Sequence, residues 1–238
     1  MTRGLLAVLA LTTAVAPGHA LEMRRNITRQ VPMDPDDSLV VRARFSDIEV
    51  YPSPDANLYL AVELIAGADT RASAEQCLAQ MAVLVEPGDG HILVSTQPES
   101  CCCEATRIGF NLVIKAPTQA NLAITNSYGN VAVKGRRGAV TVLNRFGATN
   151  AQDLTQARIS NAFGRVSAAE IRSRTEITSR FGDVTARDIA GTVEIANEAG
   201  PVRLAHSHVS ARLENQLGEI SVIGTTGAVS INSIRGPV

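Results

Sequence analysis

The feature that most constrains this chain is a short phrase that returns about every 18 residues through its second half. The phrase ends in glycine and reads Asn126-Ser-Tyr-Gly129, Asn144-Arg-Phe-Gly147, Asn161-Ala-Phe-Gly164, Ser179-Arg-Phe-Gly182, Asn197-Glu-Ala-Gly200, Asn215-Gln-Leu-Gly218 and Ser233-Ile-Arg-Gly236. Successive glycines are 18, 17, 18, 18, 18 and 18 residues apart. Such a period indicates stacked repeats, each too small to bury its apolar face alone.

Apolar residues hold fixed stations within each repeat. They stand two and four positions after each glycine and again five positions before the next, where the residues are Val142, Ile159, Ile177, Ile195, Leu213 and Ile231. Alternation at period two, with β-branched residues and breaks at Asn and Gly, is typical of short strands. Two strands and two turns fill the unit and leave no room for a helix. The sequence therefore predicts an all-β fold, a β-solenoid with coils of roughly 18 residues over 118–238.

The recurring glycine predicts a corner at the same place in every coil, because glycine accepts positive φ. The Asn before it can bond local backbone groups, and stacked copies can form an amide ladder. The aromatic residues that directly precede the glycine should stack on one another; they are Tyr128, Phe146, Phe163 and Phe181. We expect these rings to pack in the core. The alternative is a sugar-binding strip on the surface.

The first twenty residues have the order of a secretory signal peptide. Arg3 precedes an apolar stretch from Leu5 to Ala16, and Gly18 and Ala20 supply the small residues of a cleavage site. The apolar stretch is shorter than the roughly 20 residues that span a bilayer, and no later segment is apolar enough to do so. We expect an exported, soluble chain that begins near residue 21 and is periplasmic, secreted or displayed on a bacterial surface.

The part between the leader and the repeats, residues 21–117, is less regular. Residues 39–50 echo the repeat, with Ser46 where glycine would stand. Strands are expected over 57–65, 91–96 and 110–116. Ser73-Ala-Glu-Gln76 matches a capping box and predicts one short helix near 73–82. The sequence thus predicts a β-rich module with a single helix, leading directly into the solenoid.

Export changes the interpretation of the four cysteines, because disulfides persist outside the cytoplasm. Of the three pairings of Cys77, Cys101, Cys102 and Cys103, two join adjacent residues, whose Cα atoms lie closer than a disulfide prefers. The third also contains a strained bond across one residue. We expect one bridge from Cys77 to the triple-Cys segment. A thiolate site for a soft metal such as Cu(I) or Zn(II) is the alternative.

Several of these motifs together resemble one known family. They are Arg44-Phe-Ser-Asp-Ile-Glu-Val50, the single helix, Leu112-Val-Ile-Lys-Ala-Pro117 and the Gly-x-Val-x-Val coils that follow. This combination resembles the bacterial putative-adhesin family of β-strand-repeat proteins, a domain of unknown function in exported and envelope proteins. The resemblance covers essentially the whole mature chain. It implies a right-handed, β-helix-like solenoid and an adhesin-like role, and it supplies no catalytic residues.

Candidate chemistry is concentrated six residues after each glycine, where Asp153, Glu170, Asp188 and His206 form a column. Stacked carboxylates would suit a retaining glycosidase or a cation site. The simpler interpretation is a solvated corner whose charge Arg172 and Arg187 neutralise. His206 and His208 could hold a transition metal, although such surface pairs more often stay unliganded. The sequence assigns no catalytic, cofactor or metal residue.

The function that we expect is binding rather than catalysis. A near-neutral charge, with 22 Lys and Arg against 23 Asp and Glu, argues against a nucleic-acid partner. Stacked coils make a long rigid surface suited to an envelope or extracellular ligand, either polysaccharide or protein. The alternative is a polysaccharide lyase or hydrolase that uses Asp153, Glu170 and Asp188. The last coil, residues 228–238, ends without a polar cap and predicts self-association through that end.

Overall fold

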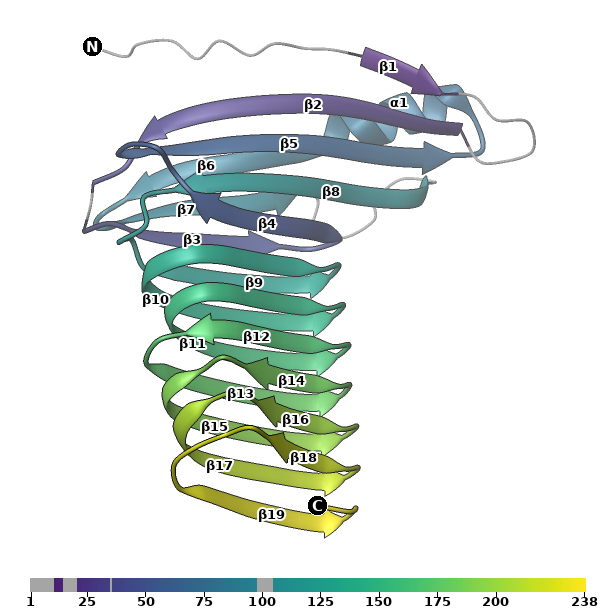
Figure 1. Cartoon of the computed structure of the whole chain (residues 1–238). Coiled ribbons are helices and arrows are strands. Elements are labelled where there is room, and N and C mark those ends of the chain that lie inside the picture. Colours follow the sequence, from purple (N-terminus) through teal and green to yellow (C-terminus); the bar gives the residue numbers. More distant parts are fainter. Residues whose placement is uncertain (1–10, 15–20, 35, 98–104) are drawn as a thin grey trace.

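The computed structural model describes residues 11–14, 21–34, 36–97 and 105–238, which form one helix and a single sheet of 19 strands (Figure 1). The elements in chain order are β1 (Leu11–Ala14), β2 (Leu21–Pro32), β3 (Ser38–Ala43), β4 (Ser46–Pro52), β5 (Asn57–Ala68), α1 (Arg71–Gln80), β6 (Ala82–Gly88), β7 (His91–Gln97), β8 (Ala105–Ala116), β9 (Leu122–Tyr128), β10 (Val131–Phe146), β11 (Thr149–Phe163), β12 (Val166–Ile171), β13 (Arg174–Phe181), β14 (Val184–Arg187), β15 (Ala190–Ala199), β16 (Val202–Ala205), β17 (His208–Leu217), β18 (Ile220–Ile223) and β19 (Val229–Arg235).

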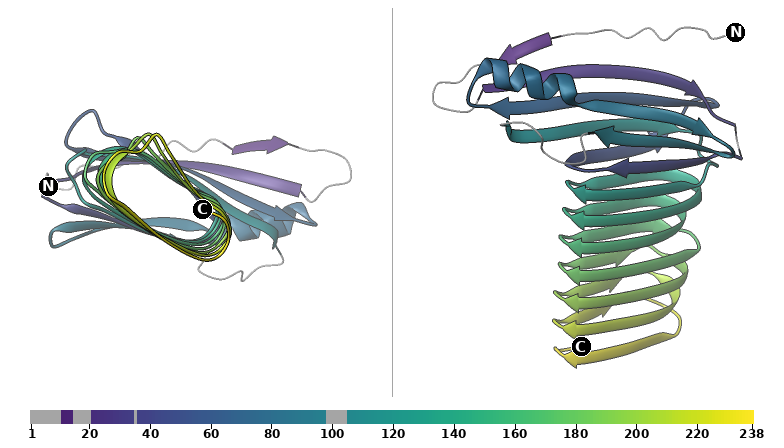
Figure 2. Two further views of the ribbon diagram at one scale, coloured as in Figure 1. Left: turned by 60° about the horizontal axis from the view of Figure 1, so that its bottom comes forward. Right: turned by 180° about the vertical axis from the view of Figure 1, so that it is seen from behind.

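The second half of the chain is the predicted β-solenoid. Each coil is a flattened oval with two faces, which Figure 2 shows in its left view. One face holds the strands that precede the corner glycines, including β13, β15, β17 and β19; the other holds the strands that follow them, including β12, β14, β16 and β18. We call these the long-strand face and the short-strand face. The longer β10 and β11 run through both faces.

All pairings between coils are parallel and keep the register that the repeat predicts. Asn144 pairs with Asn161 and Phe146 with Phe163, so that like residues stack on like. The same register continues from β11 to β13 and on to β15. Each repeat therefore contributes one coil, and its apolar stations face the space between the two faces.

One coil joins the stack out of chain order. β3 pairs in parallel with both β7 and β9, and β4 pairs in parallel with both β8 and β10. Residues 38–52 therefore form a coil that lies between β7–β8 and β9–β10, although about 70 residues of chain separate it from β9. This confirms that the segment 39–50 echoes the repeat. The division of the mature chain at residue 117 remains a prediction.

Antiparallel strands and the helix cover the N-terminal end of the stack. β5 pairs antiparallel with β8 on one side and with β2 on the other, and β6 pairs antiparallel with β7. α1 packs on β5 and β2. The predicted helix is present but begins earlier than expected, because Thr70 is its N-cap and accepts a hydrogen bond from the Ser73 backbone at 3.1 Å. Within the described residues, this ten-residue helix is too short to cross a bilayer.

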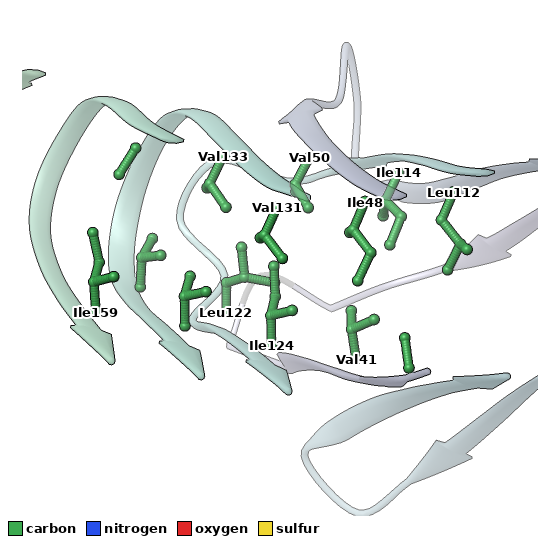
Figure 3. Packing of buried hydrophobic residues seen from close by; sticks show 14 of the residues in the cluster. Val41, Ile48, Val50, Leu112, Ile114, Leu122, Ile124, Val131, Val133 and Ile159 are labelled. Atoms are coloured by element: carbon green, nitrogen blue, oxygen red, sulfur yellow. The ribbon is translucent and has the colours of Figure 1, made fainter. Parts of the chain in front are cut away.

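The core is one continuous hydrophobic cluster that runs from the N-terminal strands into the solenoid. Figure 3 shows its coil-by-coil stacking, with Ile48, Val131 and Ile124 pointing into the same interior. Ile159, Ile177 and Ile195 continue the stack and are each at most 1% exposed. Cys77 lies on the buried side of α1. Residues 101–103 lie outside the described residues, so the bridge from Cys77 remains a prediction.

A buried arginine joins the two halves of the fold, and sequence analysis did not single it out. Arg136 is fully buried in β10 and donates hydrogen bonds to the carbonyl oxygens of Ala116 at 2.6 Å and Ala120 at 2.9 Å. Burial lowers the pKa of Arg136 to about 10. Its guanidinium thereby fixes the connection from β8 to β9, where the solenoid proper begins.

Candidate functional site

The corner glycines bring the backbones of neighbouring coils close together. Gly147 donates its N–H to the carbonyl of Phe163 at 2.9 Å, and Gly164 donates to the carbonyl of Phe181 at the same distance. Asn161 is buried and donates from Nδ2 to the carbonyls of Gly164 at 2.9 Å and Gly147 at 3.2 Å. The Asn side chains thus bond corner carbonyls of their own and the preceding coil, which fixes the direction of the two residues between Asn and Gly.

Aromatic rings form a ladder along this corner. We call it the aromatic ladder; its members are Phe45, Tyr128, Phe146, Phe163 and Phe181. Neighbouring ring centroids are 5.1, 5.0, 4.8 and 5.1 Å apart, and the rings are within 15° of parallel. The predicted stacking is confirmed. Phe45 joins as the first rung because the coil β3–β4 lies next to β9–β10.

The expectation that these rings pack in the core is wrong. Tyr128 is 37% exposed, Phe163 38% and Phe181 45%. In each strand the residue five positions before the glycine and the Asn three positions before it point inward, as Ile159 and Asn161 do. The chain then turns at the glycine, so the ring in front of it lies beyond the edge of the core. The interior is filled by Val, Ile, Leu and Ala instead.

Arginines lie beside the rings. The guanidinium carbon of Arg44 is 5.0 Å from the centroid of Phe45 and 5.8 Å from that of Tyr128. Those of Arg145 and Arg180 are 5.2 and 5.8 Å from Phe146 and Phe181 respectively. These distances are within the range of cation–π attraction. The ladder is therefore an apolar strip lined with positive charge.

The ladder ends after Phe181. The next two stations of the same column are occupied by Ala199, which pairs with Phe181 across the strands, and Leu217. The side chain that precedes Ala199 is Glu198, which pairs with Arg180 at 3.3 Å. At this coil alanine replaces the ring and a negative charge stands beside it, so the aromatic ladder has five rungs.

The opposite corner carries the carboxylate column predicted from the sequence. Asp153, Glu170, Asp188 and His206 all have positive φ, between 48° and 56°. The same station is glycine at Gly135 and Gly224, whose φ values are 69° and 58°. Asp and His tolerate this left-handed conformation better than most residues. The column therefore has a backbone cause: it is where each coil makes its second turn.

Two of the three carboxylates of this column pair with the arginines that the simpler interpretation names. Arg172 donates to Asp153 at 2.5 Å, and Arg187 pairs with Asp188 at 2.6 Å. Gln152 donates to Glu170 at 3.0 Å. The column is a surface turn in which Asp153 and Asp188 are ion-paired and Glu170 is hydrogen-bonded to a neutral amide.

The two histidines stay apart from any larger group of metal-binding side chains. His208 contacts the hydroxyl of Thr226 through Nδ1 at 2.5 Å, and His206 stands at the left-handed corner. Across the ranges that the structure describes, no three His, Cys, Asp or Glu side chains come together as a metal site requires.

The chain matches no family model and no curated protein. It is similar to several solved structures over most of its length. One is a putative adhesin from Bacteroides fragilis, with 14% identity, a TM-score of 0.43, and 88% of this chain and 97% of that chain covered. Another is a putative cell adhesion protein from Clostridium sporogenes, with 10% identity, a TM-score of 0.37, and 90% and 100% covered. A putative lipid binding protein from Parabacteroides distasonis has 14% identity, a TM-score of 0.35, and 90% and 96% covered.

Proposed function

We propose that this protein is an exported, non-enzymatic β-solenoid with an adhesin-like role, and that the aromatic ladder is the surface that binds an envelope or extracellular polymer. The observation that carries the proposal is a continuous stack of five rings, of which Tyr128, Phe163 and Phe181 are exposed and the other two are half-buried. Leaving large apolar groups in water is unfavourable, and contiguous exposed patches mark interaction sites more often than isolated residues do. A rigid straight strip suits an extended ligand.

Export is part of this proposal. β2 begins at Leu21, the first residue expected after removal of the leader, and it pairs with β5 along its whole length. Cleavage after Ala20 would leave this pairing intact. N-terminal sequencing of the protein recovered from outside the cytoplasm should begin at or near Leu21; a chain that retains Met1 would contradict the proposal.

Co-sedimentation with the envelope fraction of the source bacterium tests the binding role. We expect Phe163→Ser and Phe181→Ser to reduce the retained fraction strongly. Ile223→Ser is the matched control, because Ile223 is 52% exposed but lies at the far edge of the short-strand face. Thermal unfolding checks that all three variants fold. Equal retention of the ladder variants and the control would contradict the assignment of the ladder.

The enzymatic alternative makes a different prediction. A carbohydrate-active enzyme built on Asp153, Glu170 and Asp188 would cleave acidic or neutral polysaccharides and lose that activity in Asp188→Ala. We expect no turnover by the wild-type protein. Chain cleavage that Asp188→Ala abolishes would replace the binding role with an enzymatic one.

Self-association through the last coil is the second part of the proposal. Among the described strands, β19 pairs only with β17, so its other edge leaves backbone N–H and C=O groups open to strand addition. Ile231 faces the interior there and is only partly buried. Sedimentation velocity should therefore show concentration-dependent association that Ile231→Lys removes. A wild-type protein that stays monomeric across the micromolar range would contradict this part alone.

A further inference from the structure

The side chain two positions before each corner residue lies next to the ladder, and it follows a pattern of its own. Along the five rungs this station is occupied by Arg44, Ser127, Arg145, Ala162 and Arg180. Arginine therefore alternates with a small residue. Because neighbouring rings are 4.8–5.1 Å apart, the arginines recur at roughly twice that spacing, on every second rung.

Each guanidinium carbon lies 5.0–5.8 Å from the centroid of the ring that follows it in the chain. The Arg44 carbon is 5.0 and 5.8 Å from two centroids that are themselves 5.1 Å apart, so it stands level with the space between the two rings. The ring faces are occupied by their neighbours, and the exposed parts are the ring edges. Ring edges carry partial positive charge. The ring edges and the arginines are both positive, so they favour an anionic ligand. A neutral sugar would instead need a free ring face to stack on.

The rungs that lack arginine carry hydroxyl groups. On the Tyr128 rung, where the adjacent station is Ser127, the outward side chain two residues earlier is Thr125. On the Phe163 rung, the corresponding residue is Ser160. The rungs without arginine thus offer neutral hydroxyl groups, which can donate and accept hydrogen bonds. Thr178 supplies a further hydroxyl on the Arg180 rung, so the feature that alternates from rung to rung is the arginine.

Resting on the binding role proposed above, we propose that the ladder binds an extended acidic polysaccharide with one carboxylate on every second sugar. A pyranose ring with its linkage is about as long as one rung, so an extended chain advances one sugar per coil. Alternate carboxylates would then meet Arg44, Arg145 and Arg180 in turn. An extended peptide advances about 3.3–3.6 Å per residue, so its successive side chains do not keep step with successive rungs.

The ends of the strip set the length of the ligand. Glu198 places a negative charge next to the fifth rung and pairs with Arg180 at 3.3 Å, and Ala199 replaces the sixth ring. Arg145 stands on the central rung and has no acidic partner within 4.0 Å among the described side chains. Arg145 is therefore the main anchor, and about five sugars complete the footprint.

Isothermal titration with hyaluronan oligosaccharides of increasing length tests this proposal, because their glucuronate alternates with a neutral sugar. We expect affinity to rise up to five or six sugars and then level off, and to fall with added salt. Chitin oligosaccharides, which are neutral, should not bind. Polygalacturonate oligosaccharides, with an acid on every sugar, should bind more weakly than hyaluronan of the same length. A neutral chain that binds as well would overturn the proposal, as would poly-glutamate binding more tightly than hyaluronan.

Matched variants separate this proposal from the binding role on which it rests. Arg145→Gln should weaken hyaluronan binding about tenfold, as expected for one hydrogen bond to a charged group. Arg158→Gln is the control, because Arg158 is exposed on the long-strand face away from the rings and should leave the affinity unchanged. Equal effects of the two variants would overturn the proposal. If no acidic glycan binds while Phe163→Ser still abolishes envelope retention, the ligand class is wrong and the ladder remains the binding surface.

Discussion

Replacing Gly164 by alanine tests how closely the coils approach at the glycine corner. A Cβ added there would stand 2.7 Å from the carbonyl carbon of Gly147 and closer still to its oxygen, and both atoms are backbone of the neighbouring coil. The φ of Gly164 is 124°, so alanine is also strained at this position. Gly90, in the turn between β6 and β7, is the matched control: its φ is 68°, but no atom lies within 4 Å of an added Cβ.

Both substitutions place alanine at positive φ, and only Gly164→Ala adds a clash with backbone. Positive φ costs an alanine about 1–2 kcal/mol in the left-handed region of Gly90 and more at the φ of Gly164. At Gly164 the clash also forces its coil away from that of Gly147 and weakens two backbone hydrogen bonds between them, from Gly147 to Phe163 at 2.9 Å and from Thr149 to Arg165 at 2.8 Å. Each such bond contributes about 1 kcal/mol, and more where a buried group is left unpaired. We expect Gly164→Ala to lower the free energy of unfolding by about 3–5 kcal/mol, and Gly90→Ala by about 1–2 kcal/mol.

Urea denaturation followed by circular dichroism measures both values. The transition midpoint of Gly164→Ala should fall well below that of Gly90→Ala, with similar slopes for the two variants. Costs that agree within about 1 kcal/mol would refute the close backbone approach. Positive φ alone would then explain why glycine occupies this corner.

Three further expectations concern the core, the N-terminal sheet and the cysteines. Ile177→Asp buries a carboxylate among stacked isoleucines and should lower the free energy of unfolding by about 3 kcal/mol or more. Thr178→Asp, at the next residue and on the exposed side, should lower it by less than about 0.5 kcal/mol. Equal urea midpoints would mean that the inside and outside positions are misassigned. Burial raises the pKa of Glu63, but hydrogen bonds from Arg24 and Asn111 outweigh burial and hold that pKa below its usual range. The stabilisation by the charged carboxylate is thus present above the unfolded-state pKa and lost as pH falls through the folded-state pKa. Glu63→Gln should therefore lower the free energy of unfolding by up to about 1 kcal/mol at neutral pH and leave it unchanged at low pH. A loss of stability that does not depend on pH would exclude the charge of Glu63 as its cause. Non-reducing peptide mapping of the exported protein should join the Cys77 peptide to residues 101–103; four unlinked thiols with stoichiometric metal would favour the thiolate site instead.

Local periodicity was enough to predict the coils, their register and the two corners. The stations that alternate at period two become the buried stack of Ile159, Ile177 and Ile195, and the 18-residue spacing becomes the parallel pairing of like residues. These features follow from interactions between adjacent repeats. A sequence pattern records such interactions directly.

Features that depend on distant parts of the chain could not be predicted in the same way. The coil of residues 38–52 lies in the stack between β7–β8 and β9–β10. Its own sequence does not indicate which strands it pairs with. This placement makes Phe45 the first rung. The rings were expected inside because aromatic residues usually supply core volume, but the turn at the following glycine carries them past the core edge. The only sequence feature that marks Arg136 is the preceding residue, Gly135, which has positive φ at the second corner of the coil.

Hydroxyl-radical footprinting with and without the bound envelope polymer tests the assignment of the ladder most directly, because the radicals label exposed aromatic and aliphatic side chains in solution. We predict that binding reduces the oxidation of Tyr128, Phe163 and Phe181 severalfold and leaves Ile223, which is 52% exposed on the other face, unchanged. Undiminished oxidation of the three rings, with protection at Ile223 or at the last coil, would contradict the account and place the binding surface elsewhere on the solenoid.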